Sequence, residues 1–165
     1  LPPELPAGSI AAIARAVAPE VAIEVFAFGR IPLAISARCY HARAHGLHKD
    51  NCRFVCGEDP DGIAVETLDG EPFLAVNGLQ TLSHAAMNLA GDVALLAEAG
   101  VSALRLSPQS CDMVAVARGF RDVLDGRCEP PVLRATLTRL LPGIPFANGF
   151  LHGRPGTADV AAGVA

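Results

Sequence analysis

The sequence predicts an α/β fold with an inserted β-hairpin. Helix-like and strand-like segments alternate with short connectors, an order typical of parallel βα units. The chain is 51% hydrophobic and only 18% charged, with a mean hydropathy of +0.36. This composition favours strands covered on both faces by helices, as in a larger α/β protein. A chain of 165 residues can bury one core, so we expect one domain or part of a larger one. Two βα units alone are too few to close a barrel.

The first segments read as a helix followed by a strand. Ser9 can cap a helix over residues 9–17, where apolar side chains share one face, and Pro19 ends it. Residues 21–28 then form a strand-like apolar run that Gly29 is expected to close. Residues 30–57 are expected to form a loop or a segment that leaves the sheet and contains helix.

The remaining segments predict a hairpin and then two more helix–strand repeats. Asp69-Gly70 suits a two-residue turn between strands at 63–68 and 72–76. The segments after the hairpin alternate between helix and strand. We expect a helix over 92–99, a strand over 101–106, and helices over 111–124 and from Pro130 or Pro131 to 141. Residues 157–165 are expected to form a flexible tail.

Composition excludes several classes of protein. The most apolar stretch, residues 10–37, is interrupted by charges and leaves no membrane-spanning run. A net charge of −4 argues against a general nucleic-acid binder. Five cysteines, an odd number, argue against a disulfide framework and favour a reducing, cytoplasmic setting. Because the chain begins with Leu1 rather than Met, we expect a fragment of a larger protein.

Three cysteines form the most informative motif. Cys39, Cys52 and Cys56 are separated by twelve and then three residues. Three thiolates are one short of the four that most structural zinc sites and iron–sulfur clusters use. Basic residues dominate the same stretch and suit an anionic cluster: Arg38, Arg43, Lys49 and Arg53, against the single acid Asp50. The alternatives are a solvated basic loop and cysteines that are merely small core residues.

Histidines in the same segment offer a second set of ligands. His41, His45 and His48 stand at positions i, i+4 and i+7, which share one face if the segment is helical. They could replace a missing thiolate or bind zinc, or they could form a solvated face. Cys111 is expected in the core, and Cys128 is expected to be a free surface thiol.

A series of short motifs resembles the peptidase U32-like family, in a branch linked to oxygen-independent ubiquinone biosynthesis. The similarity covers residues 18–156, and the combination is more specific than any single motif. The motifs that carry it are Glu24-Val-Phe-Ala-Phe-Gly-Arg30, Ser36-Ala-Arg-Cys39, Lys49-Asp50-x-Cys52, Val76-Asn-Gly-x-Gln80-Thr, Leu104-Arg105-Leu-Ser-Pro-Gln109 and Asn148-Gly-Phe-x-His152-Gly.

The resemblance implies a fold, a cofactor and a partner. Residues 1–156 would be the carboxy-terminal portion of a (β/α) TIM-type barrel. Cys39, Cys52 and Cys56 would supply three of the four ligands of a [4Fe–4S] cluster, with the fourth ligand upstream and outside this chain. The protein would be a subunit of an O₂-independent ubiquinone hydroxylase, paired with a UbiU-like protein. Prephenate would be the oxygen source, and a lipid-binding ubiquinone accessory protein would be a further partner.

One departure narrows the resemblance within the family. Peptidase-like members and the UbiU-type subunit resemble Phe-Gly-x-x-Cys followed by Gly-Arg-Cys. Here Pro32 replaces the first of those cysteines, and Ala37 replaces the glycine before Arg38. This pattern favours the other subunit of the ubiquinone branch over UbiU or a protease.

Arg30, Arg105 and Gln109 are candidates for a substrate pocket, because guanidinium and amide groups suit anionic or carbonyl groups. If residues 104–107 end a barrel strand, Arg105 and Gln109 lie near the mouth where barrel sites are found. A structural salt bridge is an equal alternative for Arg105, and His152 either covers the site or only packs. No residue gains a catalytic role from sequence alone.

Two rival functions stay open. A U32-type peptidase is one, although the sequence contains no Gly-x-Ser-x-Gly and no His-Glu-x-x-His motif. A zinc-bound scaffold without redox chemistry is the other.

Overall fold

The computed structural model describes residues 1–161, which form a mixed α/β fold in two compact units. The first unit consists of Leu1–Gly29 and the residues from Ala85 onward, and the second is Arg30–His84. Strands β1 (Glu24–Ile35) and β4 (Gln80–Asn88) each continue from one unit into the other. The α/β class predicted from sequence is confirmed.

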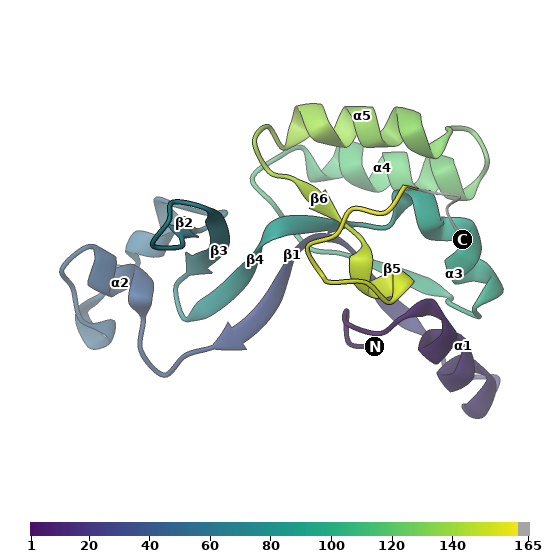
Figure 1. The fold of residues 1–165 in the computed structure, drawn as a ribbon, viewed down its shortest axis with the longest axis horizontal. Coiled ribbons are helices and arrows are strands. Elements are labelled where there is room, and N and C mark those ends of the chain that lie inside the picture. Colours follow the sequence, from purple (N-terminus) through teal and green to yellow (C-terminus); the bar gives the residue numbers. More distant parts are fainter. Residues whose placement is uncertain (162–165) are drawn as a thin grey trace. The chain divides into compact units, whose positions relative to one another are not determined.

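The first unit contains most of the helices. Figure 1 shows α4 and α5 side by side. Its other elements are α1 (Ala7–Ala16), α3 (Val93–Glu98), β5 (Ala103–Leu106), α4 (Met113–Leu124), α5 (Pro130–Leu140), β6 (Phe146–Ala147) and the 3₁₀ helices Ala90–Asp92 and Gly149–His152. No helix within the described residues is long and apolar enough to cross a membrane.

The second unit is a hairpin-based module with short helices. It holds α2 (Tyr40–Ala44), the 3₁₀ helices η1 (Lys49–Asn51) and η2 (Val55–Gly57), and strands β2 (Ile63–Glu66) and β3 (Pro72–Asn77). The predicted hairpin is confirmed, with Ile63 opposite Val76 and Val65 opposite Leu74. Its turn is longer than the expected two residues. Residues 68–70 form the turn between Thr67 and Glu71, and the Thr67 N–H donates a hydrogen bond to Glu71 O. Gly70 in this turn has φ +82.

The strands follow the order β2-β3-β4-β1-β5, with β6 beside β4. The β1–β5 and β4–β6 pairs are parallel, whereas β2, β3 and β4 form an antiparallel meander. Over residues 1–161 this sheet is open. A closed barrel is therefore not a property of the described residues.

One predicted strand end is wrong, and one strand was not predicted. Gly29 does not end β1, which continues to Ile35. β4 was not predicted, because Gln80–Asn88 mixes polar, small and apolar residues and lacks a β-branched alternating pattern. The flexible tail expected over 157–165 lies partly outside the described residues. Within the described part, Ala158 O accepts hydrogen bonds from Asn148 N and Gly149 N.

Three aromatic rings form the centre of the first unit's core. Phe28 on β1 is fully buried. Its ring meets the Phe120 ring of α4 edge-on, with centroids 5.9 Å apart, and lies 6.5 Å from the Phe146 ring of β6. The residues of β1 from Val25 to Ile31 are all buried, as expected for a strand covered on both faces.

Gly29 allows β1 to approach the segment after β5. Its φ of +106 is unfavourable for any residue with a Cβ. A Cβ there would also lie 2.9 Å from both the Cβ and the carbonyl oxygen of Ser107. Ser107 N in turn donates to Phe28 O at 2.8 Å, so the backbones cannot separate without losing that bond.

We therefore expect Gly29→Ala to lower the free energy of unfolding by about 2 kcal/mol or more, from backbone strain plus a steric clash. Gly143→Ala is the matched control, because Gly143 also has positive φ (+81) but has no atom within 4 Å of its built Cβ. The control should lose only about 1 kcal/mol. Urea unfolding of both variants tests the difference, and equal losses would contradict the packing argument.

Candidate functional site

Cys39, Cys52 and Cys56 all lie in the second unit. Cys39 precedes α2 and acts as its N-cap, since its Sγ accepts the backbone N–H of Ala42 at 3.4 Å. The Cys39 thiol also donates to Gly78 O at 3.3 Å. This cysteine is buried, so the local helix start and the β3–β4 turn fix its position.

Cys56 approaches the same turn. A Cβ built on Gly78 would lie 4.0 Å from Cys56 Sγ, and Gly78 has φ +59. Cys39 and Cys56 are seventeen positions apart in the sequence, yet both thiols lie against this one glycine. Cys39 and Cys56 thus lie near the same turn, and the convergence of the three thiols on one metal site stays a prediction.

Cys52 lies in a strained loop. The backbone of Cys52 is in the right-handed helical region. The next two residues, Arg53 and Phe54, are in the left-handed region, with φ of 53 and 54. Phe54 N–H points back at Cys52 Sγ at 3.5 Å. A right-handed residue followed by a left-handed one turns successive N–H groups toward one side, an arrangement found around anions and iron–sulfur sites. Left-handed residues that are not glycine cluster at functional sites.

Positive charge surrounds Cys39. A hollow of about 550 Å³ is lined by Cys39 together with Arg38, Arg43 and Lys49. His48 lines the same hollow. Three of the four basic residues singled out in the sequence thus lie next to one predicted ligand, where they favour an anionic group, whereas Arg53 does not line the hollow.

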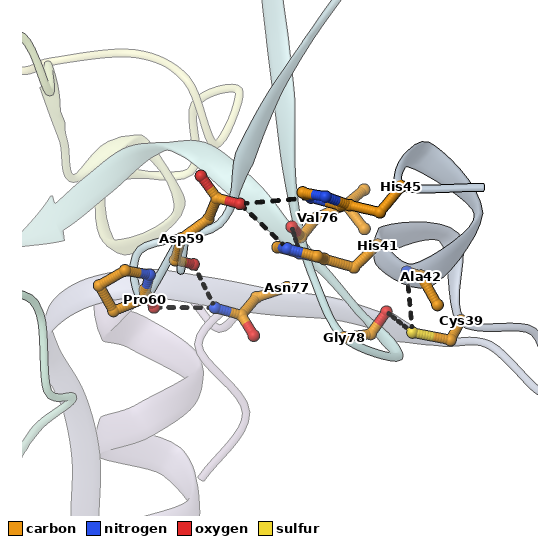
Figure 2. Close-up of polar contacts among 9 residues, drawn as sticks. All are labelled: Cys39, His41, Ala42, His45, Asp59, Pro60, Val76, Asn77 and Gly78. Atoms are coloured by element: carbon orange, nitrogen blue, oxygen red, sulfur yellow. Dashed lines mark hydrogen bonds and ion pairs between the residues drawn. The ribbon is translucent and has the colours of Figure 1, made fainter. Parts of the chain in front are cut away.

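A second group of side chains that could hold a metal ion comes from α2 and the loop after η2. The ligand atoms of His41, His45 and Asp59 all lie within 4.8 Å of one another. Figure 2 shows both imidazole rings turned toward the Asp59 carboxylate. His48 does not continue this face, because α2 ends at Ala44 and Gly46 takes φ +69. Nothing in the sequence pointed to Asp59, which belongs to a loop distant from the histidines in sequence.

Arg30 is buried, and its guanidinium group bonds to the backbone of β4. Its Nη1 donates to the carbonyls of Ser83 and His84 at 2.7 and 2.5 Å. Burial lowers the pKa of Arg30, and the nearby Asp61 carboxylate opposes that shift. Arg30 Nε is buried without a hydrogen-bond partner among the described residues. A structural role is therefore evident, and a substrate role for Arg30 stays a prediction.

The other two predicted substrate residues lie in the first unit. Arg105 on β5 forms an ion pair with Glu24 on β1, at 2.6 Å from Nη2 to Oε1, and both side chains are exposed. Gln109 donates through Nε2 to Pro108 O, and its buried Oε1 has no partner among residues 1–161. Arg105 thus forms a salt bridge, which is the alternative to a substrate role that the sequence also allowed.

Comparison with known proteins gives the family. The family model described as Peptidase family U32 matches residues 1–161. The chain belongs to peptidase family U32. No solved structure matches it. The family-level resemblance seen in the motifs is thereby confirmed.

In this U32 chain the Asn148–His152 motif builds a buried polar cluster in the first unit. His152 Nε2 lies 3.0 Å from Asp92 Oδ1, and Asn148 Nδ2 donates to Asp92 Oδ2 at 3.1 Å. Asn148 also exchanges two hydrogen bonds with the backbone of Val160. Asp92 was expected only as a helix start, so its pairing with His152 was missed. His152 packs on Asp92, in line with the packing alternative.

We expect Asn148→Ala to lower the free energy of unfolding by about 2 to 3 kcal/mol, because Asp92 Oδ2 and the Val160 N–H lose their hydrogen bonds to Asn148, while His152 still contacts Asp92 Oδ1. Asn51→Ala, at an exposed position, is the control and should change stability by no more than about 0.5 kcal/mol. Denaturant unfolding in metal-free buffer measures both. Similar losses in the two variants would show that Asn148 does not hold the cluster together.

Proposed function

We propose that this chain is the carboxy-terminal portion of a UbiV-like protein, an iron–sulfur accessory subunit for O₂-independent hydroxylation in ubiquinone biosynthesis. In this proposal it acts in the cytoplasm with a UbiU-like partner. The open α/β sheet would be part of a (β/α) barrel completed outside this chain. Membership of family U32 supports the proposal at the family level, and the cysteine motifs support the finer assignment.

The observation that carries the proposal is the environment of the three thiols. Two of them, Cys39 and Cys52, accept backbone N–H groups, and Cys56 shares the Gly78 turn with Cys39. N–H donors and the cationic hollow favour anionic sulfur ligands. Soft thiolates select zinc, copper(I) or iron–sulfur clusters rather than hard cations. The donor set therefore fits a [4Fe–4S] cluster with a fourth ligand from outside the chain.

A bound cluster would supply electron transfer or structural support. Each of the surrounding residues would have a separate role in holding that cluster. Cys39, Cys52 and Cys56 would bind the cluster, Arg38, Arg43 and Lys49 would offset its negative charge, and Gly78 O would position Cys39. No residue in the described part is assigned a proton transfer.

The family description makes a peptidase the second candidate. Metallopeptidases of the His-Glu-x-x-His type place a glutamate directly after the first histidine as general base. Here Ala42 follows His41. Peptide cleavage that survives replacement of all three cysteines would favour the peptidase over the iron–sulfur role. A zinc-bound scaffold is the third candidate.

The direct test is anaerobic purification of the full-length protein with its partner, followed by iron, sulfide and zinc analysis and a visible absorption spectrum. We expect a brown protein whose iron and sulfide contents fall on Cys39→Ala, Cys52→Ala or Cys56→Ala. Cys128→Ala is the matched control, since Cys128 lies in the first unit, and it should retain full iron content. Each variant's thermal unfolding checks that the fold survives.

A colourless protein with stoichiometric zinc would replace the redox role by the scaffold role. Equal loss of iron in Cys128→Ala and in the three motif variants would show that the cluster is not held by this motif.

A further inference from the structure

We propose that His41, His45 and Asp59 form a binding site for a divalent first-row transition-metal ion, separate from the three cysteines. This site goes beyond the proposed iron–sulfur role and does not depend on it. Its ligands are His41 of α2, His45 directly after that helix, and Asp59 of the loop between η2 and β2, all within the second unit. Figure 2 shows the three side chains converging.

The hydrogen bonds of His41 provide the first argument. Its Nδ1 lies 3.3 Å from Val76 O, and its Nε2 lies 3.1 Å from Asp59 Oδ2. Both neighbours are acceptors, whereas a neutral imidazole carries a single N–H. With Nδ1–H donated to the carbonyl, the lone pair of Nε2 faces the carboxylate, and a cation between them satisfies both. Metal-bound histidines commonly donate their other N–H to a backbone carbonyl in this way.

His45 provides the second argument. Its Nε2 lies 3.8 Å from the same Oδ2 atom of Asp59. The His41 and His45 rings are stacked, with centroids 5.4 Å apart and planes at 4°. Spacing of i and i+4 along α2 puts both rings on one side. A simple His41–Asp59 ion pair does not require a second imidazole nitrogen near the same oxygen, whereas a metal site is built from several donor atoms that converge in this way.

The loop that carries Asp59 is held in place by its own contacts. Asn77 Nδ2 donates to Asp59 O at 3.0 Å and to Pro60 O at 2.8 Å. Gly62 N also donates to Asp59 O at 2.8 Å. These bonds hold the backbone of the loop that places the Asp59 side chain opposite the histidines. Such outer contacts are what a preorganised metal site needs.

The donor set indicates the class of ion. Two imidazole nitrogens and one carboxylate suit zinc, iron(II) or cobalt(II) rather than the softer ions that thiolates select. His41 is fully buried, but the side chains of His45 and Asp59 are 34% and 39% exposed. The site therefore opens to solvent on one side. Three protein ligands leave coordination positions there for water or for an oxygen donor of a small ligand.

Cobalt(II) titration of the full-length protein under anaerobic conditions tests the site. We expect visible d–d absorption from one bound cobalt that equimolar zinc displaces. His45→Ala and Asp59→Asn should weaken this binding about tenfold or more. His48→Ala is the matched control, because His48 is an exposed histidine of the same segment outside the group, and it should bind cobalt like the unaltered protein.

Two further measurements make the outcome decisive. Thermal unfolding of the metal-free variants separates a lost ligand from a lost fold, and zinc should raise the unfolding temperature of the unaltered protein but not of His45→Ala. Cys52→Ala should keep the d–d bands. Unchanged affinity in His45→Ala, an equal loss in His48→Ala, or absorption that depends on Cys52 instead would each overturn the proposal.

Discussion

The turn between β3 and β4 is the feature on which the second unit depends. Gly78 O accepts the Cys39 thiol, and Val76 O faces His41 Nδ1. Asn77, between them, holds the loop of Asp59 through two hydrogen bonds. One short backbone segment therefore positions ligands of both candidate metal sites (Figure 2). Because Gly78 has φ +59, a residue with a Cβ at this position would strain the turn that positions these groups.

The two candidate sites differ in the chemistry that each can support. Thiolates in a cationic setting favour an anionic, electron-rich cluster. Imidazole and carboxylate ligands favour a single hard or borderline ion with open positions. Both sets lie within Arg30–His84, so this module concentrates the ligand chemistry of the described residues. The first unit supplies instead an aromatic core and the buried Asp92–Asn148–His152 cluster.

Local sequence signals predicted the features that local physics determines. The Asp69-Gly70 turn predicted the hairpin, and Pro130 predicted the start of α5, because turn and cap residues act over a few positions. The metal site that the cysteine spacing indicated stays a prediction. The contact of Asp59 with the two histidines and strand β4 were not predictable, because each is defined by tertiary contacts with segments distant in sequence. Arg105 illustrates the same limit: its partner Glu24 is brought to it by parallel pairing of β1 and β5, which no local pattern encodes.

The conformation of the loop from Cys52 to Cys56 argues that the loop is shaped by function. Two consecutive left-handed residues that are not glycine, Arg53 and Phe54, cost about 1 to 3 kcal/mol each. Packing of Phe54 does not offset that cost, because its side chain is 82% exposed. What the conformation does achieve is to direct the Phe54 N–H at Cys52 Sγ. A loop that served only as a surface connection would relieve this strain with glycine or asparagine, and binding of the proposed cluster by Cys52 and Cys56 is what would offset the cost.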